Sequence, residues 1–167
     1  MSTYLLFLVF PAIMAFAAAM DLLTMRISNR ISIALAAAFF VAALLAGLPL
    51  HDVLSHIGAG AVVLIAAILL FAVGGFGGGD GKLLAAAALW IGFEGLVEFL
   101  ALVAIAGGAL AVAILLYRRV PAIEALPVPE WALNLHKQGT GIPYGMAIAA
   151  GALLIYPHTA WFTALTS

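Results

Sequence analysis

The chain has no cysteine, which excludes disulfide bonds, cysteine-based zinc sites and thiol catalysis. Its histidines are scattered along the sequence rather than grouped, so a metal site is not expected from them either. They are His51, His56, His136 and His158. The chemistry of an active site is therefore expected to come from other side chains.

Charged residues are scarce. They make up 8% of the 167 residues, against about 25% in a soluble domain. The mean hydropathy is +1.28. A chain this apolar could not cover a surface that faces water, so lipid is expected to be its solvent. The net charge of −1 gives no support for a nucleic-acid partner.

No lysine or arginine precedes the first apolar run, residues 4–20. A secretory signal peptide usually begins with a positively charged region. We therefore expect this run to be a retained first membrane span.

Six apolar segments predict an all-α, polytopic membrane protein with a single membrane-embedded domain and no soluble domain. The predicted spans cover about residues 4–20, 31–48, 54–73, 83–95, 98–117 and 143–162. The stretch between Lys82 and Arg118 is divided in two, because one helix of about 35 residues would be about 53 Å long, against a hydrocarbon core of roughly 30 Å. The turn is expected near residues 92–98, and residues 118–142 are expected to form the longest loop.

The basic residues support this topology. All of them lie in three connecting segments, at Arg26 and Arg30, at Lys82, and at Arg118, Arg119 and Lys137. With six spans these segments fall on one side of the membrane, and the positive-inside rule places that side in the cytoplasm and both termini outside. Five spans would separate Lys82 from Arg118 and remove the asymmetry.

Most of the acidic residues are expected to be solvated. Those at the outer turns and in the long loop are Asp52, Glu94, Glu98, Glu124 and Glu130. The last two could also attract a basic substrate.

Asp21 and Asp80 differ, because each lies at the predicted inner end of an apolar span. Asp21 follows an almost purely apolar run, and Asp80 lies within the glycine-rich sequence GGFGGGDGK. An ionisable residue at a membrane boundary is costly to desolvate and is a functional candidate for that reason. The alternative is that each residue only caps or solvates a helix end, and spacing alone does not decide between the two.

If the two carboxyl groups meet, their chemistry is specific. Two carboxylates a few ångström apart share one proton and titrate as a unit. The ionised member accepts a proton from water while the protonated member polarises a peptide carbonyl. This is aspartic-protease chemistry, and it requires no metal or cofactor. Gly77, Gly78 and Gly79 would let the backbone approach a substrate closely, or would form a flexible loop.

Other glycine motifs do not fit this segment. A phosphate-binding loop ending at Gly81 and Lys82 requires glycine at position 76 and serine or threonine at position 83. The chain has Phe76 and Leu83 there. The dinucleotide-binding pattern finds no match in the segment either.

Three short motifs resemble those of the type IV prepilin peptidases, in that family's order and with its six spans. They are GGGDGKL at residues 77–83, Asp21 followed by ISN at 27–29, and IPYG at 142–145. The resemblance covers nearly the whole chain. It implies an aspartic endopeptidase that removes the short basic leader of pilin precursors at the cytoplasmic face, before a hydrophobic pilin helix.

By this resemblance Asp21 and Asp80 are the catalytic pair. The other motif residues would shape or support the site, and they are Asn29, Gly77, Gly79, Lys82, Pro143, Tyr144 and Gly145. Ser28 stands where the family often has proline, which is expected to alter only the stiffness of the loop. Lys82 would either pair with a substrate glutamate or neutralise Asp80 locally.

Long bacterial members of that family have an extra N-terminal region with paired cysteines, associated with N-methylation of the trimmed pilin. The sequence shows no cysteine and no such region, so it resembles the short, peptidase-only branch, similar to the enzymes that serve Flp-type pili. The archaeal preflagellin peptidases are similar to this plan too, and the compact length and the GIPYG form of the third motif favour the Flp-type branch. We therefore expect a multi-pass protein of the bacterial inner membrane that acts on pilin precursors, in contact with lipid and without methyltransferase activity. Two other functions fit the same features: a small proton-coupled transporter, and a non-catalytic subunit of a pilus or secretion machine.

Overall fold

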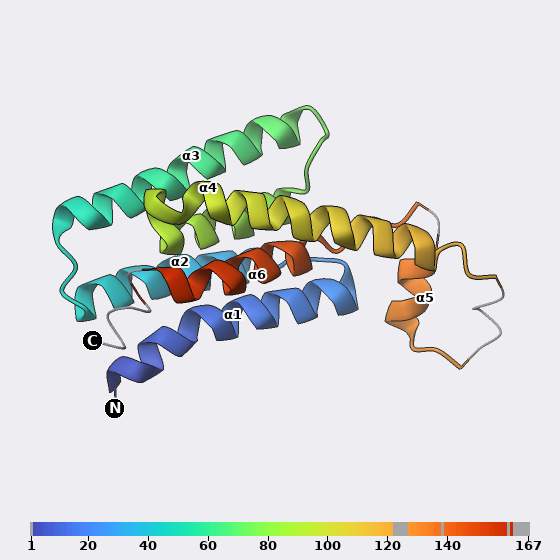
Figure 1. Ribbon diagram of the computed structural model, residues 1–167, viewed down its shortest axis with the longest axis horizontal. Coiled ribbons are helices and arrows are strands. Elements are labelled where there is room, and N and C mark those ends of the chain that lie inside the picture. The colour runs from blue at the N-terminus through green and yellow to red at the C-terminus, as the bar shows by residue number, and fades with distance from the viewer. Residues whose placement is uncertain (1, 122–126, 138, 160, 162–167) are drawn as a thin grey trace.

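The computed structural model describes residues 2–121, 127–137, 139–159 and 161. These residues contain no β-strand, so the predicted all-α fold is confirmed. The helices are α1 (Ser2–Thr24), α2 (Asn29–Leu45), α3 (Leu50–Ala72), α4 (Gly78–Tyr117), α5 (Glu130–His136) and α6 (Tyr144–Ile155), followed by the 3₁₀ turn Tyr156–His158. In the bundle, α3 packs along α4, α4 contacts α2 and α6, and α1 packs against α6 and α2 (Figure 1).

Helix α4 reverses direction at a single residue. Gly92 has φ 74° and ψ 178°, which separates helical residues 78–91 from helical residues 93–117. The second part runs back beside the first (Figure 1). Glycine suits this position because it adopts positive φ without strain, and because a Cβ there would lie 2.8 Å from Cε1 of His56. The expected turn over residues 92–98 is therefore confined to its first residue, and helix resumes at once.

The long connection after α4 contains a helix that the sequence did not predict. The expectation of a loop over all of residues 118–142 is wrong for Glu130–His136, which form α5. Tyr117 donates from its hydroxyl to the carbonyl of Ala132 (3.2 Å), and Arg118 donates to the carbonyl of Leu135 (2.8 Å). Two side chains at the end of α4 thus hold α5 in place.

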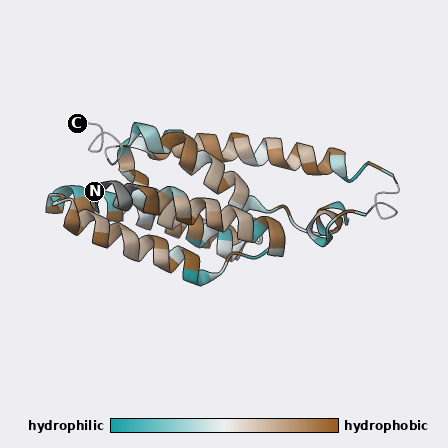
Figure 2. Ribbon diagram, turned by 90° about the horizontal axis from the view of Figure 1, so that it is seen from below, coloured by the Kyte–Doolittle hydropathy of each residue, from teal (hydrophilic) through white to brown (hydrophobic). Residues whose placement is uncertain are grey.

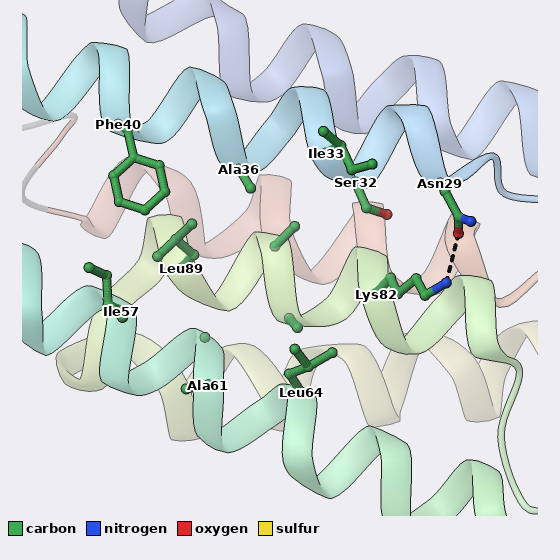
Figure 3. Close-up of a pocket in the computed structure, with 13 residues that line it drawn as sticks. Asn29, Ser32, Ile33, Ala36, Phe40, Ile57, Ala61, Leu64, Lys82 and Leu89 are labelled. Atoms are coloured by element: carbon green, nitrogen blue, oxygen red, sulfur yellow. Dashed lines mark hydrogen bonds between the residues drawn. The ribbon is translucent and has the colours of Figure 1, made fainter.

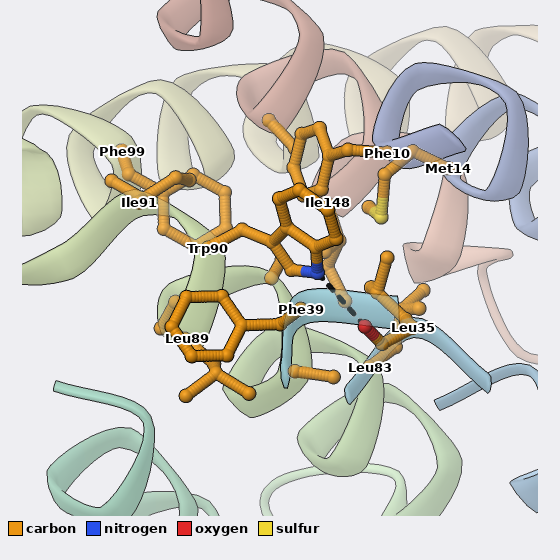
Figure 4. Close-up of a cluster of buried hydrophobic side chains, with 14 of the residues drawn as sticks. Phe10, Met14, Leu35, Phe39, Leu83, Leu89, Trp90, Ile91, Phe99 and Ile148 are labelled. Atoms are coloured by element: carbon orange, nitrogen blue, oxygen red, sulfur yellow. Dashed lines mark hydrogen bonds between the residues drawn. The ribbon is translucent and has the colours of Figure 1, made fainter. Parts of the chain in front are cut away.

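The core of the bundle is aromatic at the end where α4 reverses. Trp90 is 1% exposed, and its ring lies 5.3 Å from Phe10 of α1 and 5.9 Å from Phe39 of α2, centroid to centroid (Figure 4). The indole N–H of Trp90 donates to the carbonyl of Leu35 (2.8 Å). The indole N–H of Trp161 donates in turn to the carbonyl of Trp90 (2.8 Å). Helices α1, α2 and α4 are therefore joined at this end by both packing and hydrogen bonds.

Apolar residues run along most of the length of the helices (Figure 2). Helices α3 and α4 are long and apolar enough to cross a membrane, and α1 from Leu8 and α2 are shorter apolar helices. Many large apolar side chains of α3 point outward, among them Leu54, Ile65, Ile68, Leu69 and Phe71. Because a soluble protein rarely exposes so continuous an apolar face, the surroundings of these helices are expected to be apolar too.

The segments that contain the basic residues lie at one end of the bundle. The connection from α1 to α2, the start of α4 and the end of α4 with α5 are all found there (Figure 1). The connection from α2 to α3, the reversal of α4 and the start of α1 lie at the other end. This arrangement places the basic segments together, as the charge pattern predicts.

Candidate active site

Asp21 is a buried carboxylic acid in the last turn of α1. Its residue surface is 4% exposed, and its Oδ2 atom accepts a hydrogen bond from the backbone N–H of Gly145 (2.7 Å). Gly145 lies in the first turn of α6, where the backbone N–H groups have no partner within the helix. The carboxyl of Asp21 thus connects the end of one helix to the start of another that is far away in sequence.

Asp80 lies in the first turn of α4, directly after the glycine-rich segment. The helix begins after Gly77, whose backbone is extended (φ −73°, ψ 133°). A Cβ at Gly77 would overlap Oδ2 of Asp80, so the carboxyl folds back over this glycine. The side chain is half-buried, and it lies near enough to Asp21 for the two carboxyl groups to interact electrostatically. The structure therefore brings the two predicted catalytic residues into one site.

Glycines line this site where helices approach each other. A Cβ at Gly79 would lie 3.2 Å from the carbonyl oxygen of Ile27, in the connection between α1 and α2. A Cβ at Gly145 would lie 2.8 Å from Oδ2 of Asp21 and 2.8 Å from Cδ1 of Ile27. Ile27 therefore sits between the glycine of α4 and the glycine of α6. Larger residues at either position would displace one of the two carboxyl-bearing segments.

Pro143 and Tyr144 border the site at the start of α6. Pro143 is fully buried and precedes the helix as its N-cap, rather than forming its first turn. The ring of Tyr144 meets Phe76 of the glycine-rich segment edge to face, with centroids 5.8 Å apart. Its hydroxyl lies against Gly107 in the second part of α4, where a Cβ would overlap it. Tyr144 thus connects the segment before Asp80 to the returning half of α4.

Lys82 and Asn29 form a polar contact beside the carboxyl pair. The ammonium group of Lys82 donates to Oδ1 of Asn29 at the start of α2 (2.9 Å). Within the described residues Lys82 makes no ion pair, with Asp80 or with any other acid. Residues two apart on a helix point to different faces, so Lys82 and Asp80 project to opposite sides of α4. Lys82 was expected either to pair with a substrate glutamate or to neutralise Asp80 locally. No contact between Lys82 and Asp80 in the described residues supports the second role.

Three other residues near the site have structural features that the sequence analysis did not predict. Ile27 fills the space between two glycines, although only its place in a motif suggested a role. Met25 has a positive φ of 54°, which is uncommon for a residue with a side chain and marks a tight turn directly after α1. Ser32, the hydroxyl that precedes the apolar part of α2, is buried beside Lys82 and Asn29. Composition alone gives little signal for the first two, whereas the polarity of Ser32 could have drawn attention.

The remaining acids lie away from the carboxyl pair. Asp52 is paired with His51 (3.0 Å) in the first turn of α3, at the opposite end of the bundle. Glu94 and Glu98 are exposed just after the reversal of α4, and Glu130 is exposed at the start of α5. Glu124 lies outside the described residues. Asp21 and Asp80 are thus set apart by burial as well as by position.

Comparison with known protein families matches residues 8–112 to the type IV leader peptidase family. The chain belongs to this family. The matched segment runs from α1 into the second part of α4 and includes both Asp21 and Asp80. The resemblance to prepilin peptidases is therefore confirmed, while the motif at residues 142–145 lies beyond the matched segment. No curated protein and no solved structure matches the chain.

Membership of the leader peptidase family gives the site its context. A member of this family is a leader peptidase-like protease, and pilin precursors are the substrates that the family implies. The two helices long enough to cross a membrane, together with the family, indicate a membrane protein.

Proposed function

We propose that this chain is an aspartic leader peptidase that cleaves pilin precursors, with Asp21 and Asp80 as its catalytic pair. The observation that supports this most directly is that the carboxyl groups of α1 and α4 lie near enough to interact electrostatically, within the segment matched to the family.

The mechanism follows from two carboxyl groups that share one proton. The ionised carboxylate takes a proton from a water molecule, which then attacks the carbonyl carbon of the scissile peptide. The protonated carboxyl donates a hydrogen bond to the carbonyl oxygen and stabilises the tetrahedral intermediate. Collapse of the intermediate breaks the C–N bond, and the leaving amine receives a proton from the pair. The two groups therefore titrate as a unit, and the cleavage rate is expected to fall on both sides of a pH optimum.

The surrounding residues position the pair. The N–H of Gly145 fixes one oxygen of Asp21, which leaves the other oxygen available to water or substrate. Gly77 leaves room for the carboxyl of Asp80 and Gly79 leaves room for Ile27, so the two glycines set the position of the start of α4. Tyr144, packed on Phe76, limits the positions that the glycine-rich segment can take.

The setting that we propose is the bacterial inner membrane, with six spans and the carboxyl pair at the cytoplasmic face. The basic segments at the same end of the bundle support this orientation. A periplasmic reporter fused after residue 167 should be active and a fluorescent cytoplasmic reporter should be dark. The reverse result would overturn the orientation and leave the protease assignment standing. The Flp-type pilin is the preferred substrate, from the resemblance of the motifs.

Co-expression with a Flp-type pilin precursor tests the catalytic pair. The wild-type chain should convert the precursor to a smaller product on a gel, and Asp21→Asn and Asp80→Asn should each slow conversion by about 10⁴-fold. The matched control is Asp52→Asn, which changes a carboxylate at the opposite end and should cleave as the wild type does. Equal amounts of folded protein in the membrane must be shown for all four chains.

Other outcomes favour other functions. Substantial cleavage by either single variant would remove that residue from the catalytic pair. No cleavage of several matched precursors by the wild type, together with proton flux in liposomes that depends on Asp80, would favour a transporter. Full pilus assembly in a strain that carries both substitutions would favour a non-catalytic assembly subunit.

A further inference from the structure

An elongated groove lies between α2, α3 and α4, on the side of α4 that faces away from Asp21. Its volume is about 480 Å³. Each helix contributes residues three or four positions apart, so that three parallel stripes of side chains form the walls and floor (Figure 3). The stripes include Ala36 and Phe40 of α2, Ile57 and Ala61 of α3, and Leu89 of α4.

The two ends of the groove differ in polarity. One end, at Phe40 and Ile57, is apolar, whereas the other is bordered by Asn29, Ser32 and Lys82 (Figure 3). This polar end lies next to the catalytic segment, because Lys82 follows Asp80 by two residues and Asn29 follows Ile27 by two. The groove therefore begins at the level of Asp80 along α4, on the opposite face of that helix, and runs along the bundle away from that end.

The polar end has donors without acidic partners. The hydroxyl of Ser32 is buried and has no hydrogen-bond partner among the described residues, and Ser32 is only 6% exposed. The ammonium group of Lys82 donates to one neutral amide oxygen and has two further protons to give. An unpaired buried hydroxyl beside an ammonium group without a carboxylate is costly, unless a ligand that accepts hydrogen bonds completes the arrangement.

We propose that this groove binds the apolar segment of the substrate that follows the scissile peptide, as a helix, and that Lys82 and Ser32 bind a carboxylate near the start of that segment. The proposal rests on the proposed function, because it needs a substrate cleaved at Asp21 and Asp80. Lys82 and Ser32 would then be specificity residues, and Ala61 would contact the bound helix.

The shape of the groove favours a helix. From Asn29 to Phe40 the groove spans about 16 Å, which equals about 11 residues of a helix. Its lining includes the small residues Gly60, Ala61, Ala85 and Ala86, which allow the backbone of another helix to come close. A carboxylate on the first turn of such a helix would meet the ammonium group of Lys82 while the rest of the helix covered the apolar walls.

A steric test uses two alanines of α3. Ala61→Phe fills the groove, whereas Ala66→Phe adds the same ring at an exposed position outside it. With a Flp-type precursor that the wild type cleaves, Ala61→Phe should raise KM about tenfold and leave kcat within about twofold, because the carboxyl pair is untouched. Ala66→Phe should change neither. An unchanged KM in Ala61→Phe would overturn the groove and leave the catalytic pair as it stands.

A charge test examines the polar end. Lys82→Glu should raise KM for a precursor that has glutamate at the start of its apolar segment, and replacing that glutamate by lysine should restore cleavage by this variant. Ser32→Ala should also raise KM, yet it should not lower the unfolding temperature, since it removes an unpaired buried hydroxyl. Absence of rescue by the exchanged charges would overturn the role of Lys82.

Cross-linking tests the occupant without cleavage. Because the chain has no cysteine, a single cysteine can be placed in the groove by Ile57→Cys, with Ala66→Cys as the control. In a chain that also has Asp21→Asn and Asp80→Asn, Ile57→Cys should form disulfides with precursor cysteines spaced three or four residues apart. The opposite result has two parts: no such cross-links form, and a phospholipid stays bound to the purified wild type but not to Ala61→Phe. This result would show that the groove binds lipid and would overturn the proposal.

Discussion

The two ends of the bundle use different contacts between the same helices. At the end where α4 reverses, Phe10, Phe39, Trp90 and Trp161 pack together, and two indole N–H groups donate to backbone carbonyls. At the other end glycines lie where the helices approach each other, and the backbone N–H of Gly145 in α6 donates a hydrogen bond to Asp21 in α1. The two ends, which we call the aromatic end and the carboxyl end, are about 15 Å apart along α4.

This difference separates stability from activity. Large buried rings at the aromatic end remove much apolar surface from solvent and fix the helices relative to each other. Glycines at the carboxyl end make no such contacts, because they have no side chain. They leave space that a carboxyl pair and a peptide backbone can share. Substitutions at the aromatic end should therefore change the free energy of unfolding, and those at the carboxyl end should change the rate of cleavage.

The largest expected effect on stability is that of Trp90→Ala. This change removes a side chain that is 1% exposed, leaves a cavity and breaks the hydrogen bond to Leu35. The free energy of unfolding should fall by about 4 kcal/mol, measured by denaturant titration in detergent. Phe16→Ala, at a position that is 56% exposed, is the control and should have a much smaller effect. Cleavage by the Trp90 variant well below its unfolding temperature should persist, and its loss there would contradict the separation.

The next effect should fall on activity. In Gly145→Ala the new methyl group would lie 2.8 Å from Oδ2 of Asp21 and from Cδ1 of Ile27, so the carboxyl must move. A displacement of about 1 Å at a catalytic group can cost about 100-fold in rate, and we expect a loss of this size in kcat. Gly108→Ala is a matched control, because a Cβ there meets nothing within 4 Å. Equal loss in both variants would show that the carboxyl end has no special sensitivity.

Much of this arrangement could be predicted from the sequence. Apolar runs of about 20 residues indicate helices whatever their neighbours are, and the basic residues indicate which connections lie together. Asp21 and Asp80 stand out because carboxyl groups at the ends of apolar runs are rare. Each of these signals depends only on residues that are close in sequence, so it can be recognised without knowledge of the packing.

Other features depend on packing and could not be predicted. At Gly92 the ring of His56 lies where the Cβ of a larger residue would be, and no pattern near Gly92 reveals that contact. Helix α5 is held by Tyr117 and Arg118 from another helix. The backbone N–H of Gly145 donates a hydrogen bond to Asp21. The motif at residues 142–145 indicated that Gly145 lies near the site, but not that it makes this hydrogen bond.

A smaller effect on stability is expected for Gly92→Ala. Alanine at φ 74° is strained, and its methyl group would lie 2.8 Å from the ring of His56, which itself contacts the carbonyl of Leu89 through Nδ1 (2.8 Å). Together these should lower the free energy of unfolding by about 2 kcal/mol. Gly47→Ala is the comparison without a contact, since Gly47 also has a positive φ (67°) and a Cβ there meets nothing within 4 Å. If the two variants lose the same amount, the contact with His56 adds nothing.

The smallest effect tests a single hydrogen bond of the aromatic end. Trp161→Phe keeps an aromatic ring near Trp90 but removes the indole N–H that donates to the Trp90 carbonyl (2.8 Å). That carbonyl precedes the reversal at Gly92, so it has few other donors within reach, and its loss of a partner should lower the free energy of unfolding by about 1 kcal/mol. Trp131→Phe makes the same chemical change in α5, away from the aromatic end, and should have almost no effect. Because both variants should cleave a precursor at the wild-type rate, a slower rate in Trp161→Phe alone would show that the aromatic end also controls the carboxyl pair, and the two ends would then have to be treated as one unit.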